Sequence, residues 1–225
     1  KNFMDFFKFL STTDLFRGIK EDDIRKLTGY LGYKNKQYDK NETIFGTGDK
    51  VSKTGILLSG SVNMIINHPW GASSLFGRKS AGGVIGGMYP GATERPLVFD
   101  IVAAENCEVM FFDTDKMLTV TENSPACHAD MLRNLVSIAA ETCMNQAVRM
   151  IHIAPKPLRH RLMSYLEEQA LINDSRKFRI PVTHKQLAEY LNVNRSAMSY
   201  ELSRMREEGL INYHKSDFEI FFGNK

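Results

Sequence analysis

The polar side chains that could do chemistry gather in the last third of the chain, between residues 183 and 204. They are hydroxyl, amide, imidazole, ammonium and guanidinium groups, all of which form hydrogen bonds. The candidate set comprises Thr183, His184, Lys185, Asn194, Arg195, Ser196, Ser199, Tyr200 and Arg204. No nucleophile–base pair or pair of carboxylates in the sequence points to an enzyme, so we expect no catalytic residue and predict that this set binds a partner.

Two short helices would position these side chains. Thr183 and Gln186 have the spacing of a capping box, in which the side chain of each residue satisfies the backbone N–H of the other. Asn192 tolerates the left-handed conformation that a tight turn requires, and Asn194 would cap the second helix. The predicted inner faces of the two helices consist of Leu187, Ala188 and Leu191, and of Met198, Leu202 and Met205.

A short helix, a four-residue turn and a second helix with polar residues in its first turn form the helix-turn-helix arrangement. The free amides of a helix N-terminus favour a phosphate, and Arg195 could bind guanine through two hydrogen bonds. His184 and Lys185 are predicted to contact phosphate, and strands at residues 211–214 and 218–222 would form a wing-like hairpin. The alternative is a structural helical hairpin, but the turn, the caps, the polar residues and the wing together favour DNA binding.

The charge of the chain is distributed as a DNA-binding segment would require. The first 154 residues contain 17 Lys and Arg and 17 Asp and Glu, whereas the rest contains 12 and 9, so the net charge of +3 lies entirely in the last third. No apolar run approaches the ~20 residues that span a bilayer, so no membrane partner is expected. The widely spaced Cys107, Cys127 and Cys143 indicate a reducing, cytoplasmic compartment and no structural metal site.

The first half of the chain has a different pattern of residues. Residues 3–10 and 21–32 have helical spacing. Between about residues 36 and 113, short β-rich runs alternate with glycines, which is typical of a sandwich or a rolled barrel. The predicted strands are residues 43–45, 55–58, 62–66, 74–78, 98–102 and 109–112. No glycine occurs between Gly91 and Gly209, so helices are expected to follow.

A long helix is predicted after the strands, with Ser124 as its N-cap and Pro125 as its first helical residue. It would run to about Ile153, before the break at Pro155. Alternating spacings of four and three give it the heptad seam of a two-stranded coiled coil. The seam consists of Leu132, Val136, Ala139, Cys143, Gln146 and Met150. It favours a homodimer, and the alternative is that this face packs on the chain's own barrel.

Leu135 and Ile138 lie off the seam and could pack on the barrel, which would leave the seam for a partner. The resulting prediction is an α+β fold with three parts. A β-roll or jelly-roll sensor domain would occupy residues 1–123, a long dimerisation helix residues 124–154, and a winged helix-turn-helix domain residues 155–225.

These features resemble a known family over nearly the whole chain. The segments that carry the resemblance are residues 14–18 (DLFRG), 55–62 (GILLSGSV), 82–86 (GGVIG) and 188–211. In order and spacing they are similar to the CRP/FNR superfamily of bacterial regulators. The resemblance implies a homodimer that binds a palindromic operator in double-stranded DNA under the control of a small-molecule effector, with RNA polymerase as a further candidate partner.

The resemblance also assigns roles within the second helix of the helix-turn-helix. Arg195 corresponds to the family's guanine-reading arginine. Ser196 and Tyr200 occupy positions where better-known members often carry Glu and Arg, so we expect a different target half-site.

The chain departs from the cyclic-nucleotide binders of that family. Those proteins hold the ribose and phosphate with a Gly-Glu pair and an Arg-Ser pair. Here Gly86 is followed by Gly87, and the second pair falls on Leu97 and Val98, while Arg95 would serve only with a gap in the alignment. Without a cation a phosphodiester loses its charge-assisted hydrogen bonds, so cyclic AMP is not expected.

We expect a different small-molecule effector, an aromatic or organic acid, between the barrel and the long helix. The predicted walls are Ile85, Gly86, Gly87, Met88, Tyr89, Arg95, Leu97 and Val98, and, on the helix, Thr142, Asn145, Gln146 and Arg149. No cysteine precedes Cys107, which excludes the family's iron–sulfur cluster, and haem is not expected. Two alternatives stay open: a regulator without an effector, and a small-molecule-binding module or enzyme whose helix-turn-helix is only structural.

Overall fold

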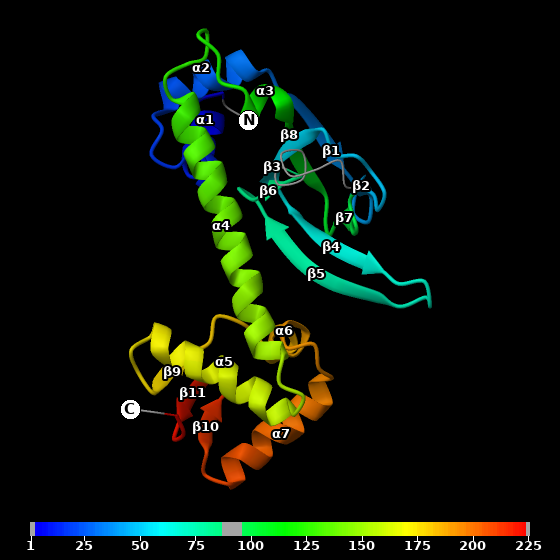
Figure 1. Cartoon of the computed structure of the whole chain (residues 1–225), viewed down its shortest axis with the longest axis vertical. Coiled ribbons are helices and arrows are strands. Elements are labelled where there is room, and N and C mark those ends of the chain that lie inside the picture. The colour runs from blue at the N-terminus through cyan, green and yellow to red at the C-terminus, as the bar shows by residue number, and fades with distance from the viewer. Residues whose placement is uncertain (1–2, 87–95, 224–225) are drawn as a thin grey trace. The chain divides into compact units, whose positions relative to one another are not determined.

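The computed structural model of the chain describes residues 3–86 and 96–223, with side chains from residue 6 onwards (Figure 1). The chain divides into two compact units, Lys1–Glu141 and Thr142–Lys225. The division falls inside the long helix α4 (His128–Ile153). Within each unit the elements follow the predicted α+β order: a sandwich and the start of the long helix in the first, and a winged helix-turn-helix in the second.

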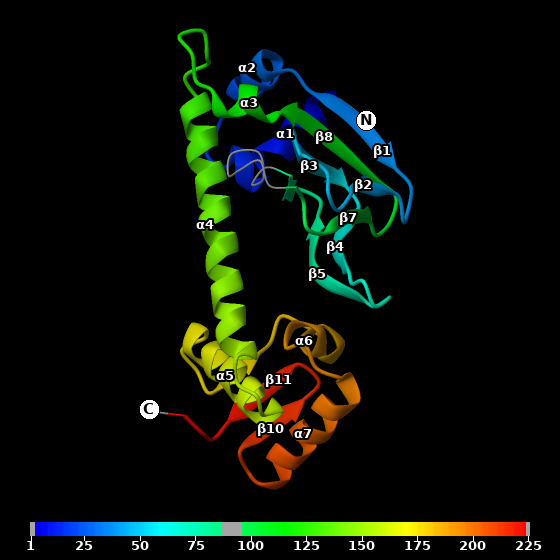
Figure 2. The ribbon, with the colours of Figure 1, turned by 45° about the vertical axis from the view of Figure 1, so that its right-hand side comes forward.

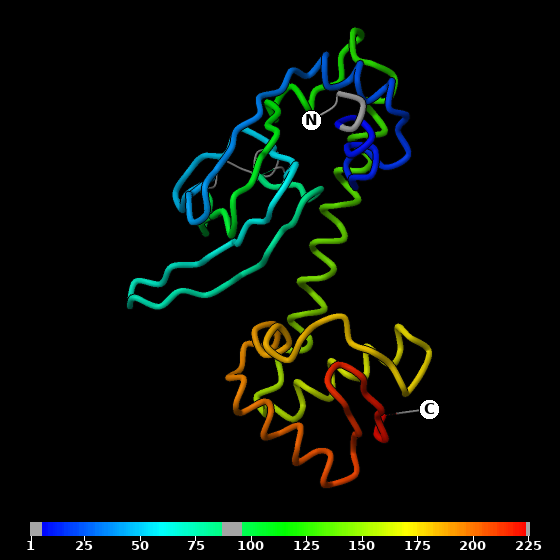
Figure 3. Tube along the Cα trace, turned by 180° about the vertical axis from the view of Figure 1, so that it is seen from behind, coloured from blue at the N-terminus to red at the C-terminus, as the bar shows by residue number. Residues whose placement is uncertain are grey.

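Two antiparallel sheets form the sandwich of the first unit. One sheet has the order β1-β8-β3-β6 and the other β2-β7-β4-β5. The strands are β1 (Lys34–Tyr38), β2 (Thr43–Phe45), β3 (Lys53–Ser59), β4 (Ser61–Asn67), β5 (Ser73–Ser80), β6 (Val84–Ile85), β7 (Asp100–Ala103) and β8 (Cys107–Asp113). All six predicted strands are present, and β4 and β5 form a long hairpin (Figure 3).

Two strands of the sandwich were not predicted because they lack the expected pattern. β1 has the sequence KNKQY, in which only Tyr38 is buried, so no alternation of apolar residues marks it. β6 has only two residues, Val84 and Ile85. Both strands exist because their partners, β8 and β3, supply the backbone hydrogen bonds.

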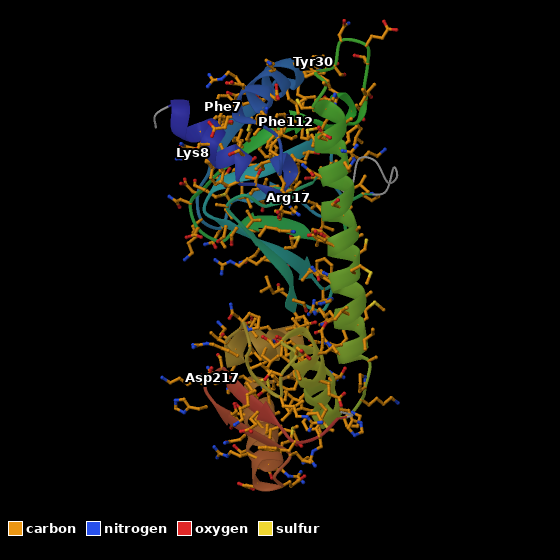
Figure 4. The ribbon with its side chains drawn as sticks, turned by 90° about the vertical axis from the view of Figure 1, so that its left-hand side faces the viewer. Phe7, Lys8, Arg17, Tyr30, Phe112 and Asp217 are labelled. Carbon is orange, nitrogen blue, oxygen red and sulfur yellow. The ribbon has the colours of Figure 1, made fainter. Side chains whose placement is uncertain are left out.

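Helices cover the outer face of the first sheet. They are α1 (Phe3–Ser11), the 3-10 turn η1 (Asp14–Phe16), α2 (Glu21–Leu31) and α3 (Thr114–Leu118), and α1 and α2 confirm the helices predicted from spacing. Alternation along β8 separates two cores. Met110 and Phe112 pack with Phe7 of α1 (Figure 4), whereas Val109 and Phe111 face the interior of the sandwich.

The long helix α4 begins later than predicted. Ser124 is not its N-cap: its hydroxyl accepts a hydrogen bond from the backbone N–H of Thr121 (2.9 Å) and donates one to the hydroxyl of Tyr30 (3.2 Å). A further turn, closed by the His128 N–H on the Pro125 carbonyl, precedes the helix. The predicted end at Ile153 is confirmed. None of the described helices combines the length and apolar character that crossing a membrane needs.

The second unit has its own hydrophobic core. Figure 2 shows the ribbon of its helices and strands. Its elements after α4 are α5 (Leu158–Ile172), β9 (Lys177–Arg179), α6 (His184–Tyr190), α7 (Arg195–Glu207), β10 (Ile211–His214) and β11 (Asp217–Ile220). The strands form one sheet in the order β10-β11-β9. The predicted wing is therefore present, although its second strand is residues 217–220 rather than 218–222, and the three-residue strand β9 was not predicted.

Candidate functional site

The first helix of the candidate site, α6, is capped as predicted. The hydroxyl of Thr183 accepts a hydrogen bond from the backbone N–H of Gln186 at 3.3 Å, and the Gln186 amide oxygen accepts one from the Thr183 N–H at 2.8 Å. Both bonds of the capping box are present, which satisfies N–H groups that a helix start otherwise leaves unpaired.

The turn between the helices is also as predicted. Asn192 has φ 54°, in the left-handed region that asparagine tolerates better than most residues. The side-chain oxygen of Asn194 accepts hydrogen bonds from the N–H groups of Ser196 (2.8 Å) and Ala197 (3.4 Å). The four residues from 191 to 194 thus separate α6 from α7 and fix where α7 starts.

Because one face of α7 is buried, its opposite face is exposed to solvent. Met198, Leu202 and Met205 are fully buried in the core of the second unit, which also contains Leu187 of α6 and Leu191 of the turn that follows it. This confirms the predicted inner faces of both helices. The first turn of α7 therefore presents polar groups to solvent.

Arg195, Ser196 and Tyr200 are exposed on that outer face, and Ser199 is half-buried. Within the described part of the chain, no hydrogen bond or ion pair engages the Arg195 guanidinium. A planar cation at a helix N-terminus, surrounded by hydroxyl groups, suits a nucleic acid: it can bind a guanine edge while the helix dipole and amides favour phosphate.

The other predicted DNA-binding residues have partners inside the protein. The Nε2 atom of His184 lies 2.8 Å from the carbonyl oxygen of Lys215 in the wing, and its ring lies against Phe218. Arg204 lies near the other end of α7 and its guanidinium is 3.5 Å from Glu208. Thr183 and Asn194 act as caps, and Lys185 is 4.0 Å from Glu189. Their contacts with DNA stay predictions.

The side chain of Arg159 in α5 binds two carboxylates at α7, and this contact was not predicted. Its Nε atom donates to Glu201 at 2.6 Å, and its two terminal nitrogens donate to the carboxylate of Glu208 at 2.5 and 2.8 Å. These bonds raise the pKa of Arg159 and lower the pKa of Glu208. No local sequence signal could reveal this clamp, since Arg159 lies 42 and 49 positions before its two carboxylate partners.

The last turns of α4 pack on α6 within the second unit. His152 is 2 % exposed and lies between the hydroxyl of Tyr190 and the carboxylate of Glu168. Arg149, predicted to line an effector pocket, donates from Nε to the backbone carbonyl of Tyr190 at 3.0 Å and stacks over its ring. Here Arg149 supports the helix-turn-helix, and its role toward an effector stays a prediction.

The predicted effector residues of the first unit are only partly described. Gly87, Met88, Tyr89 and Arg95 lie outside the described residues. Ile85 and Leu97 are buried in the sandwich core, and Val98 is exposed. Gly86 has φ 74°, and a Cβ atom there would lie 2.6 Å from the Lys53 carbonyl oxygen, so this position requires glycine.

The remaining predicted residues of the pocket lie on α4 in the second unit. Thr142 and Gln146 are half-buried, and Asn145 is exposed. The two predicted walls thus fall in separate units, and the pocket stays a prediction.

The predicted seam on α4 includes large apolar side chains exposed to solvent. Val136 and Met150 are 68 % and 67 % exposed, and Cys143 is exposed. Leu132 packs partly on the core of its own unit, together with Leu135 and Ile138. Exposed small and apolar residues at heptad spacing include Val136, Ala140, Cys143, Ala147 and Met150, and Met144 and Ile151 are exposed beside this stripe. Ala139 and Gln146 of the predicted seam are half-buried, and the dimer interface stays a prediction.

Among the described residues, no three His, Cys, Asp or Glu side chains gather as metal ligands would.

Two protein-family patterns match parts of this chain. The pattern of the cyclic nucleotide-binding domain family matches residues 35–124, and that of the Crp-like helix-turn-helix domain family matches residues 160–221. No curated protein matches the sequence.

Several solved structures share the fold. CprK complexed with OCPA is 17 % identical, with a TM-score of 0.64 over 88 % of this chain and 91 % of that one. The c-di-GMP responsive regulator CLP of Xanthomonas campestris is 13 % identical, with a TM-score of 0.60 over 91 % of this chain and all of the other. FixK2 from Bradyrhizobium japonicum is 16 % identical, with a TM-score of 0.51 over 85 % and 94 % of the two chains.

Proposed function

Since this chain belongs to the CRP/FNR superfamily of transcriptional regulators, we propose that it is a sequence-specific DNA-binding regulator controlled by a small-molecule effector other than cyclic AMP. The family consists of regulators rather than enzymes. Its DNA-binding fold is present here in the second unit. The specific operator, the dimer and the effector are the parts that we propose.

The observation that carries the proposal is the exposure of the Arg195 side chain. Its side chain is exposed in the first turn of α7, and the helix behind it is fixed by the Asn194 cap and the Arg159 clamp. The rigid helix fixes the position from which this side chain starts, and the planar guanidinium can form two hydrogen bonds with a base edge. Ser196, Ser199 and Tyr200 surround it with hydrogen-bonding groups that would set the sequence preference.

The exposed stripe on α4 supports a parallel homodimer. A row of apolar side chains at heptad spacing is stabilised when a second copy covers it. A two-fold dimer would place two α7 helices about one DNA turn apart on a palindromic operator. A cytoplasmic location and contact with RNA polymerase would accompany such a role.

The effector proposal rests on Leu97, the residue that we predict at the phosphate-binding position. Leu97 is 1 % exposed and its apolar side chain lies in the sandwich core. An alignment without gaps places the arginine of the cyclic-nucleotide binders on Leu97, whereas Arg95 would take that position only with a gap. A buried leucine offers no charge to a phosphodiester. The related CLP responds to c-di-GMP and CprK is complexed with OCPA, so the fold accepts different effectors.

A mobility-shift titration tests the proposed function. The DNA would be fragments from the region upstream of the protein's own gene, with shuffled sequence of equal length as reference. We expect wild-type protein to prefer one fragment strongly, and the Arg195→Ala variant to lose most of that preference. The matched control is Arg17→Ala, which removes an exposed arginine of the first unit (Figure 4). Equal binding of wild-type protein to all fragments would contradict the proposal.

A further inference from the structure

A cavity of about 740 Å³ opens at the edge of the sandwich, between strands β1 and β2. Its lining comes from residues 31–36, 38, 44–45, 53 and 111–113. It lies wholly in the first unit and shares no residue with the effector pocket predicted from the sequence. The cavity is large enough for a drug-sized small molecule.

Aromatic rings form the floor of this cavity. Tyr38 and Phe111 are 5 % and 9 % exposed, and Phe45 is half-buried beside them. The Phe45 and Phe111 rings meet edge to face at 5.9 Å, and the Tyr38 and Phe111 rings do so at 6.4 Å. Such a floor favours a planar ring, because aromatic groups prefer offset or edge-to-face contacts with one another.

Three lysines surround the floor. Lys34 pairs with Phe111 across β1 and β8, so the two side chains share the inner face of the sheet. Lys36 lies two residues further along the same face. On the far side of β8, Lys53 shares this face with Gly55, which also pairs with Phe111. All three lysines line the cavity.

The charge at the cavity is only partly neutralised. In the described part of the molecule, no ion pair or hydrogen bond engages the Lys34 or Lys53 ammonium group. The Lys36 Nζ atom is 4.0 Å from Glu42 Oε1 and lies 4.3 Å from the centre of the Tyr38 ring. Asp113 also lines the cavity, and its Oδ1 atom accepts a hydrogen bond from the backbone N–H of Lys116 at 3.0 Å.

From these observations we propose that the cavity is a binding site for a small aromatic carboxylate. The ring would lie on Phe45 and Phe111, and the carboxylate would accept charge-assisted hydrogen bonds from Lys34 and Lys53. Lysines on an edge strand also discourage pairing between molecules. That protective role needs no ligand and no aromatic floor, so a binding experiment separates the two explanations.

The test is calorimetric titration of the full-length protein with 2-naphthoate at low ionic strength. We expect saturable binding of one molecule per chain, weakened by added salt because the lysines are exposed. The double variant Lys34→Gln/Lys53→Gln should bind at least ~10-fold more weakly. The uncharged 2-naphthamide should bind wild-type protein weakly and should distinguish little between the two proteins.

The matched control is Lys8→Gln/Lys26→Gln, which removes two exposed lysines of the same unit outside the cavity lining. It should bind 2-naphthoate as wild-type protein does. The proposal is overturned if binding is absent, if the double variant binds as tightly as wild-type protein, or if Arg149→Ala alone abolishes binding. The last outcome would assign the probe to the effector pocket predicted from the sequence, and the DNA-binding proposal would survive any of the three.

Discussion

The Nδ1 atom of His152 lies 2.9 Å from the hydroxyl oxygen of Tyr190, which joins the last turn of α4 to the first helix of the helix-turn-helix. On its other side, the Nε2 atom is 3.4 Å from a carboxylate oxygen of Glu168. Burial lowers the pKa of the His152 imidazole, and the nearby Glu168 offsets this only in part. The neutral ring is therefore the form that the folded second unit favours.

A pH-dependent stability follows from that pKa. Because the folded-state pKa of His152 lies below 6.5, the unfolded chain binds the proton more readily. The stabilisation by His152 is therefore complete above about pH 6.5 and falls as the pH drops from there toward the lowered pKa. We expect the difference in unfolding free energy between wild-type protein and His152→Gln, from urea denaturation, to shrink on acidification. A difference that is constant with pH would contradict the neutral, buried ring.

The base-reading role of Arg195 predicts a loss confined to specific DNA. Arg195→Ala should cost roughly 1–3 kcal/mol of binding free energy on the operator, mostly at one base pair of each half-site. Fluorescence anisotropy with operator and single-base variants would measure this. An equal loss on random DNA would show that Arg195 contacts only the backbone.

Lys185 should behave differently, as an exposed ammonium group on α6. We predict that Lys185→Ala weakens binding to all sequences alike and reduces the slope of log Kd against log salt by about one. Salt titrations on operator and random DNA would show the effect. If the loss were limited to the operator, Lys185 would be reading bases.

The exposed stripe on α4 predicts the oligomeric state. Val136→Glu/Met150→Glu should place like charges opposite each other in a two-stranded seam and give monomers in sedimentation velocity. As a control, Asn145→Glu adds a charge to an exposed position off the stripe and should leave the dimer intact. A double variant that sediments like wild-type protein would exclude this face as the interface.

The helix-turn-helix could be predicted closely from the sequence because its signals are local. The capping pair Thr183 and Gln186, the turn residue Asn192 and the cap Asn194 act within a few positions of one another. Local hydrogen bonds and helical periodicity hardly depend on the rest of the chain. The start of α4 was wrong because Ser124 has two possible uses, and its contact with the distant Tyr30 decides between them.

The sequence by itself thus determined the order of the elements, the strands with apolar alternation and the residues that α7 exposes. Only the tertiary structure decided which distant groups meet. Arg159 contacts Glu201, which lies 42 positions later in the chain. Lys34 and Lys53 lie on the same face of the sheet as Phe111, although β1, the strand that carries Lys34, has no apolar pattern of its own. Such contacts depend on strand register and helix packing, which the whole core sets, so neither residue type nor spacing reveals them.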